Sequence, residues 1–191
     1  MRKIIASLDI GSHTLKLVVG EMFKNKLNIL ACVDVPARGI KKGFVVNPES
    51  AVEAFVDVFK KAEEQLGLPV TEVVACVPAS GIECFLSEGY VSINNENRII
   101  GGSDVTKALK SSIYNKLSDN QEIVAVLPTK FLLDDALATD MPLGKKAEKL
   151  RVKTVVATVP RKNVSAIVKC LERCGVRVAH ITIGSLGDYY E

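Results

Sequence analysis

Histidine is scarce in this 191-residue chain, and long apolar runs are absent from it. With only two histidines, a metal site built on imidazole ligands is not expected. No stretch approaches the roughly 18 consecutive apolar residues of a membrane-spanning helix. The apolar N-terminal stretch meets Asp9 too early for a signal peptide, whose apolar core is about 7–15 residues long.

An excess of charge of either sign is also missing. The 25 basic and 22 acidic residues leave a net charge of only +3, which gives no electrostatic reason to expect a nucleic-acid or membrane-surface partner. The cysteines are odd in number and lie mostly in apolar runs, so we expect reduced core thiols in a cytosolic protein. They are Cys32, Cys76, Cys84, Cys170 and Cys174. The last two share a helix face, but no further ligand flanks them, which favours core packing over a metal or redox pair.

Apolar periodicity predicts an α/β fold. The strands predicted in the first part are residues 4–10, 15–19, 26–35 and 70–77. Between the last two, Asn47 and Pro48 are helix-start signals and Gly67 is a stop signal, around an apolar stripe with helical spacing. The order β-β-β-α-β is typical of a sheet covered by helices.

The pattern changes after Pro78 and returns to alternating helix and strand after Pro160. In between we predict strands at 88–93, 123–127 and 151–159 and a helix at 104–117, with 131–133 either a further strand or an extension of the second. Residues 134–150 hold Pro142, Gly144 and many charges, and are predicted to be a loop. A helix ending at Gly175 and a strand at 177–183 follow. The sequence therefore predicts a discontinuous domain of residues 1–85 and 160–191, with 86–159 inserted into it.

One local motif carries chemistry, and it lies between the first two strands. Asp9 ends the buried strand, Gly11, Ser12 and Thr14 occupy the turn, and Lys16 lies on the returning strand. Glycine lets backbone N–H groups approach phosphate oxygens, hydroxyls add donors, and a lysine adds positive charge. An aspartate there is suited to holding Mg²⁺, through water. The alternative is an ordinary tight turn, but the motif's place at the start of an α/β unit favours phosphate binding.

This motif resembles the first phosphate-binding segment of the actin, sugar-kinase and Hsp70 superfamily. Further segments resemble the FtsA family of bacterial actin-like cell-division proteins, and they follow the family's order over nearly the whole chain. They are residues 39–46, 62–67, 89–93, 103–105, 123–134 and 142–150. Two positions depart from the family: His13 stands in the phosphate loop, and Gly-Ser-Leu-Gly at 184–187 replaces Glu-Pro-Leu-Ala.

The resemblance implies an actin-like (ribonuclease H-like) mixed sheet, with residues 1–85 and 160–191 as subdomain 1A. Residues 86–159 would be the inserted strand–helix–strand–strand (SHS2) subdomain 1C. It also implies phosphate binding by Gly11, Ser12, His13, Thr14 and Lys16, with Asp9 at Mg²⁺. The implied function is an adaptor on the cytoplasmic face of the membrane at the division site. Such an adaptor binds ATP, forms filaments, and links FtsZ to the membrane and to later division proteins.

Two alternatives stay open: a PilM-like pilus-assembly adaptor, and the first lobe of a superfamily phosphotransferase. No catalytic residue is assigned, and any enzyme activity would be at most a weak ATPase of the full-length protein. The superfamily's second phosphate loop, its adenosine-binding turn and the family's C-terminal membrane helix do not follow within residue 191. We therefore expect a fragment that binds ATP weakly or not detectably.

The charged segment 134–150 is a candidate protein-interaction site. Asp134 and Asp135 lie at its start, and Lys145 and Lys146 lie near its end. Long loops are usually functional or disordered, and a head-to-tail partner would match the acidic end of one copy to the basic end of the next. The alternative is a solvated loop whose charges keep it soluble.

Overall fold

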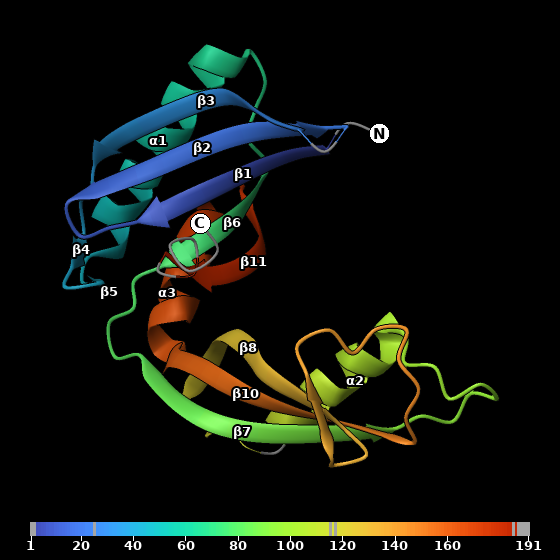
Figure 1. The fold of residues 1–191 in the computed structure, drawn as a ribbon. Helices are drawn as coiled ribbons and strands as arrows, with labels where there is room; N and C mark the ends of the chain where they lie inside the picture. The colour runs from blue at the N-terminus through green and yellow to red at the C-terminus, as the bar shows by residue number, and fades with distance from the viewer. Residues whose placement is uncertain (1–2, 25, 115, 117, 185, 187–191) are drawn as a thin grey trace. The chain divides into compact units, whose positions relative to one another are not determined.

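The structure is a computed structural model that describes residues 3–24, 26–114, 116, 118–184 and 186 (Figure 1). The chain divides into two compact units: Met1–Gly81 with Val159–Glu191, and Ile82–Thr158. The sequence placed its boundaries at 85/86 and 159/160. That these two units correspond to subdomains 1A and 1C stays a prediction. Each unit is described by itself below.

The first unit is built on a five-stranded mixed sheet in the order β11-β6-β1-β2-β3. Its strands are β1 (Lys3–Ile10), β2 (Thr14–Phe23), β3 (Lys26–Pro36), β6 (Glu72–Val77) and β11 (Arg177–Ile183). Strands β1, β6 and β11 run parallel, whereas β1, β2 and β3 form an antiparallel meander. Buried and exposed residues alternate along β1 and β2, so that Leu8, Leu15 and Leu17 face the core.

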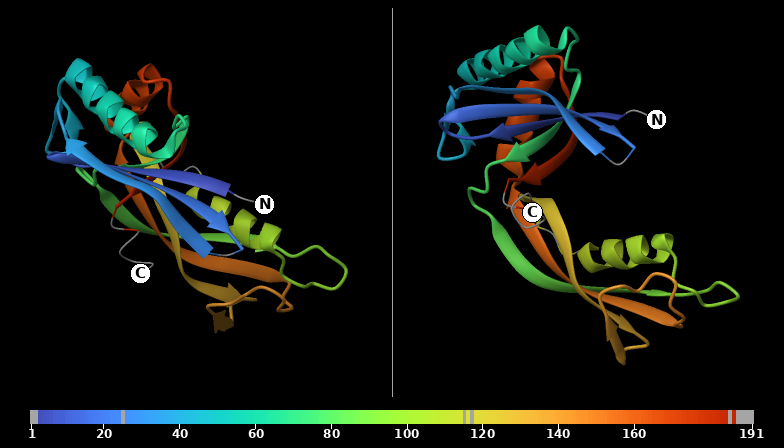
Figure 2. Two further views of the ribbon diagram at one scale, coloured as in Figure 1. Left: turned by 90° about the horizontal axis from the view of Figure 1, so that it is seen from above. Right: turned by 45° about the horizontal axis from the view of Figure 1, so that its top comes forward.

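Two helices complete this unit, α1 (Pro48–Leu66) and α3 (Arg161–Arg173), and they contact each other. Figure 2 shows α1 lying along one face of the sheet, where it contacts β2 and β3. The predicted start and stop signals are confirmed. The Asn47 side chain accepts from the Ser50 N–H at 3.1 Å, and Gly67 ends the helix with a φ of 70°. A small hairpin of β4 (Ile40–Lys41) and β5 (Phe44–Val45), missed by the sequence pattern, precedes α1.

The second unit follows the order strand, helix, strand, strand, with a short extra strand before the last. Its elements are β7 (Glu83–Ser92), α2 (Gly102–Ile113), β8 (Gln121–Leu133), β9 (Leu137–Thr139) and β10 (Lys149–Pro160). They form a sheet in the order β7-β10-β8-β9, and α2 packs on β7. A core of Ile100, Phe131 and Leu150, among others, lies between helix and sheet.

One alternative that the sequence left open is settled in this unit, and two details differ from the sequence prediction. Strand β8 runs without interruption through Pro128, so residues 131–133 extend it, as the second alternative had it. The predicted loop 134–150 contains β9 and forms a hairpin with the end of β8. Helix α2 ends at Ile113, and Leu117, its predicted end, lies outside the described residues.

All five cysteines are free, but the prediction that they are core thiols is wrong for two of them. Cys32 and Cys84 are exposed, because each lies on the outward-facing side of its strand. Burial raises the pKa of both the Cys170 and the Cys174 thiol, which keeps these thiols protonated at neutral pH. Within the described part of the chain, no helix has the length and apolar character needed to cross a membrane.

Candidate functional site

The charged residues of the predicted phosphate motif lie on the exposed face of the sheet, opposite the face that carries the buried leucines. Asp9 of β1 pairs in register with Lys16 of β2, and Lys16 pairs in register with Asp34 of β3. All three are exposed. A Cβ placed on Gly184, just after β11, would lie 3.7 Å from the Asp9 carboxylate. Asp9 therefore lies at the carboxyl end of β1, beside the end of β11, where it is open to solvent.

The turn between β1 and β2 is closed by its own backbone. The Gly11 N–H donates to the Thr14 carbonyl at 3.1 Å, and the Ala37 N–H donates to the His13 carbonyl at 2.9 Å. A Cβ on Gly11 would lie 2.6 Å from the Thr14 oxygen, so no other residue fits there. The N–H of Gly11 itself is engaged within the hairpin, and the glycine is required by the turn. Its predicted role, to let backbone N–H groups approach a phosphate, stays a prediction.

Ser12 is the residue of this turn best placed to act as a donor. Its half-buried hydroxyl oxygen accepts from the Gly43 N–H at 2.9 Å. A serine hydroxyl carries one hydrogen and two lone pairs, so after accepting this bond it still has its hydrogen to donate. Thr14 is also half-buried, and His13 is exposed. The hydroxyl of Ser12 and the positive charge of Lys16, on the strand that leaves the turn, fit an anionic phosphate group.

Cys76 lies next to Asp9, since the two are paired in register between β6 and β1. Burial, more than the neighbouring Asp9 carboxylate, raises the pKa of the Cys76 thiol, while the Ser7 hydroxyl, 3.6 Å away, opposes the shift. The raised pKa keeps the thiol protonated at neutral pH, which makes it a poor nucleophile.

Among the residues that the structure describes, no group of three or more histidine, cysteine or acidic side chains gathers to hold a metal ion. A single exposed carboxylate such as Asp9 nevertheless fits Mg²⁺, which keeps several waters and is bound through one or two carboxylates and the phosphates of its substrate. The donor set of this hairpin is therefore compatible with a magnesium–nucleotide complex.

The candidate interaction residues of the second unit are tied to one another. Asp134 accepts from the backbone N–H groups of Glu148 and Lys149 at 2.9 and 2.8 Å. Asp135 pairs with Lys149 at 3.0 Å and with Arg151 at 2.6 Å, and Lys145 donates to the Thr139 hydroxyl at 2.6 Å. The prediction of separate acidic and basic ends is wrong, because the β8–β9 turn brings Asp135 against the start of β10. Lys146 is exposed, and its backbone bridges to Ile99.

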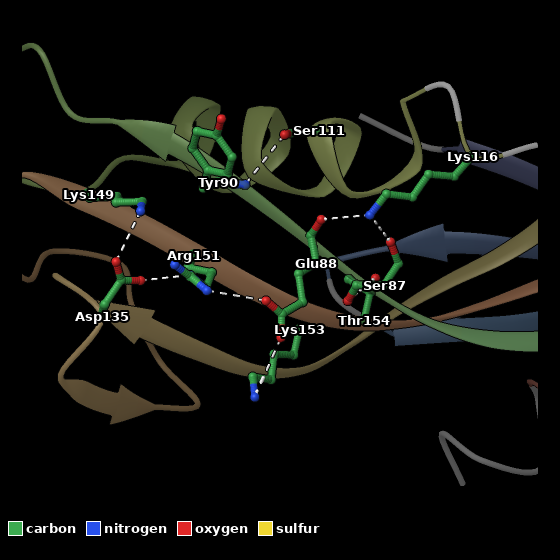
Figure 3. Close-up of polar contacts among 10 residues, drawn as sticks. All are labelled: Ser87, Glu88, Tyr90, Ser111, Lys116, Asp135, Lys149, Arg151, Lys153 and Thr154. Carbon is green, nitrogen blue, oxygen red and sulfur yellow. Dashed lines mark hydrogen bonds and ion pairs between the residues drawn. The ribbon is translucent and has the colours of Figure 1, made fainter.

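Figure 3 shows that this pairing continues across the outer face of the sheet. Arg151 also pairs with Glu88 of β7 at 3.3 Å, and Lys153 reaches the same carboxylate at 3.5 Å. The hydrogen bond from Lys149, followed by the one from Arg151, holds the pKa of Asp135 below its ordinary value. Exposed ion pairs of this kind stabilise a fold only slightly. This row of paired charges therefore forms a polar surface and adds little to the stability of the unit.

The two units together define a class of protein. A mixed sheet with helices and a strand–helix–strand–strand unit inserted in it is the architecture of an actin-like α/β protein with an SHS2 domain. Residues 79–158 match the family described as the SHS2 domain inserted in FtsA.

The whole chain is similar to cell division protein FtsA, as its sequence motifs indicated. It is 28% identical over 184 residues to FtsA of Bacillus subtilis (strain 168), which is 96% of this chain and 42% of that protein. With FtsA of Streptococcus pneumoniae serotype 2 (strain D39 / NCTC 7466) it is 25% identical over 179 residues, 94% of this chain and 39% of that protein. The chain thus spans about two fifths of the length of these relatives.

A solved structure supports the fold independently. The PilM–PilN type IV pilus biogenesis complex aligns with a TM-score of 0.61 and 16% sequence identity, over 97% of this chain and 49% of that one. At this identity the likeness concerns the fold alone.

Proposed function

We propose that this chain is the N-terminal part of an actin-like cell-division adaptor that binds ATP with Mg²⁺ and self-associates into filaments. In this proposal it links FtsZ and later division proteins to the cytoplasmic face of the membrane at the division site. A C-terminal helix beyond these residues would make the membrane contact. The observation that carries the proposal is the hairpin at the end of β1 in a chain similar to FtsA. There Asp9 and Lys16 are paired in register on the exposed face, and Ser12 in the turn keeps its hydroxyl hydrogen to donate.

Each residue of the hairpin has a separate role in this proposal. Ser12 donates to a phosphate oxygen, and Lys16 offsets phosphate charge. Asp9 orients waters around the magnesium ion, while Gly11 closes the turn. His13 and Thr14 lie beside these groups as further contacts to phosphate. The pilus-assembly alternative rests on the likeness of folds. The phosphotransferase alternative would need a catalytic base, and the sequence pattern assigned none.

Replacing Asp9 with asparagine tests the nucleotide site. In the full-length protein, Asp9→Asn is expected to weaken ATP binding about 10–100-fold in the presence of Mg²⁺, the usual effect of losing a group that orients a metal's ligands. In EDTA the variant is expected to bind ATP no worse than the wild type, because it has lost a carboxylate that repels phosphate. Calorimetric titration measures both affinities.

Asp34→Asn is the matched control, because it removes the same charge from the same sheet face, two strands away. It should keep the magnesium dependence of the wild type. An Asp9→Asn variant that retains full magnesium-dependent affinity would remove Asp9 from the site.

We also propose that the exposed lysines after β9 contribute to self-association. Reversing Lys145 and Lys146 to glutamate in the full-length protein is expected to weaken self-association several-fold at low salt and to leave ATP affinity unchanged. Exposed charge pairs contribute about 0.2–1 kcal/mol each and are screened by salt. Sedimentation at two ionic strengths measures the effect. The control reverses Lys107 and Lys110, which are exposed on α2 of the same unit. Equal effects of the two reversals would show that only net charge matters.

A further inference from the structure

The Ser12 hydroxyl is the last member of a hydrogen-bonded relay that starts at Ser80. The Ser80 hydroxyl donates to the Lys42 carbonyl at 2.6 Å, and the Gly43 N–H donates to the Ser12 oxygen at 2.9 Å. The Lys42 carbonyl and the Gly43 N–H belong to one peptide group. Because hydrogen bonds in series polarise one another, a donor at Ser80 strengthens the bond that reaches Ser12. We call these four residues the Ser80 relay.

The close approach at the centre of the relay requires glycine. Gly43 is buried, and its φ of 78° lies in the left-handed region. A Cβ there would lie 2.1 Å from the Ser80 oxygen and 2.7 Å from the Pro78 Cβ. The peptide therefore rests directly on Ser80, and any larger residue would push the two apart.

Asn163 of α3 holds the other side of Gly43. Its Nδ2 donates to the Gly43 carbonyl at 2.8 Å in a buried contact between residues far apart in sequence. Only 4% of Asn163 is exposed, and its Oδ1 has no hydrogen-bond partner in the described structure. A buried acceptor without a partner destabilises the fold. Packing alone would therefore not favour an asparagine at position 163, and its contact with Gly43 accounts for it.

We propose that Ser80 and Asn163 are positioning residues for phosphate binding. Ser80 holds the carbonyl of the Lys42–Gly43 peptide, and Asn163 holds the carbonyl of the next peptide, Gly43–Phe44. Together they fix Gly43 so that its N–H occupies a lone pair of the Ser12 oxygen and leaves the hydroxyl hydrogen for the phosphate. Neither residue touches the nucleotide. The inference rests on the proposed function, in which the hairpin at the end of β1 binds ATP. Support of this kind is what keeps a binding group in its productive geometry.

A double-mutant cycle in the full-length protein tests the relay, with MgATP affinity measured by calorimetry. Ser12→Ala is expected to weaken binding about tenfold, the effect of one hydrogen bond to a charged group. Ser80→Ala is expected to weaken it about three- to fivefold, because the donor remains but is no longer oriented. The double variant should bind like Ser12→Ala alone, since residues that act through one another are not additive. Ser80→Thr restores the hydroxyl and should recover the affinity.

Asn163→Leu provides a second test of the relay. It is expected to weaken MgATP binding in the wild-type background and to cause no further loss of affinity when Ser12 is already alanine. Ser165→Ala is the control, because Ser165 is exposed on the same helix as Asn163. Additive losses from Ser12→Ala and Ser80→Ala, or an unchanged affinity in Ser80→Ala, would overturn the relay while leaving the ATP site in place. A wild-type protein that does not bind MgATP would overturn the proposed function, and the relay with it.

Discussion

Replacing Gly89 with alanine is expected to destabilise the second unit by about 3 kcal/mol, at the upper end of the usual cost of overpacking. Gly89 is buried in β7 where α2 crosses it. A Cβ there would lie 2.2 Å from the Ala108 carbonyl oxygen and 2.3 Å from the Ser112 nitrogen. Both are backbone atoms, so the whole helix must move away from the sheet. The bond from the Ser87 hydroxyl to the Ser112 carbonyl, 2.5 Å long, would stretch with it.

Thermal unfolding of the Gly89→Ala variant measures this effect. In a domain of this size, about 3 kcal/mol lowers the melting midpoint by roughly 10 °C or more. Gly102→Ala is the matched control, because nothing lies within 4 Å of a Cβ at this first residue of α2. The control should melt like the wild type or slightly higher, since alanine favours helix. Equal midpoints for Gly89→Ala and the wild type would show that α2 does not pack this closely on β7.

The first unit was largely predictable because its signals are local. The caps of α1 at Asn47 and Gly67 lie where the sequence placed them. An apolar run such as that of β1 reads as a strand without any knowledge of its neighbours. The β4–β5 hairpin escaped because each of its strands has only two residues, too few for a periodic pattern.

The second unit was harder to predict around residues 134–150. Asp134 and Asp135 both have positive φ values, 50° and 60°, and form the turn between β8 and β9. Aspartate tolerates this conformation, but two acidic residues in a row look equally like a solvated charge cluster. The partners of Asp135 lie on β10, so their pairing depends on the tertiary fold.

At the candidate site, the sequence indicated the residues of the hairpin but not their support. Asp9, Ser12 and Lys16 were recognisable because they are close in sequence. Asn163 lies 120 positions from Gly43, and nothing in its neighbourhood marks it as part of a phosphate site. Gly43 lies in a glycine-rich segment, and that composition predicts a turn. It does not predict that Gly43 contacts Ser80, which is 37 positions away.

The other prediction with a large expected effect concerns residues 1–191 alone, which should bind ATP far more weakly than the full-length protein. The residues of the hairpin that would meet phosphate are exposed or half-buried, so each phosphate contact replaces an interaction with water. The net gain is about 0.5–1.5 kcal/mol for a neutral hydrogen bond. Binding also costs the nucleotide and the protein about 4 kcal/mol or more in lost translational and rotational freedom. A few contacts from one hairpin cannot offset that loss without a second set of groups closing on the nucleotide.

Parallel calorimetric titration of MgATP into the full-length protein and into residues 1–191 tests most directly whether this chain carries one half of a nucleotide site. We expect saturable binding by the full-length protein and little or no heat of binding from residues 1–191 at the same concentrations. Circular dichroism of the shorter chain should show that it is folded in the same buffer. Equal affinities of the two, or no binding by either, would contradict the account.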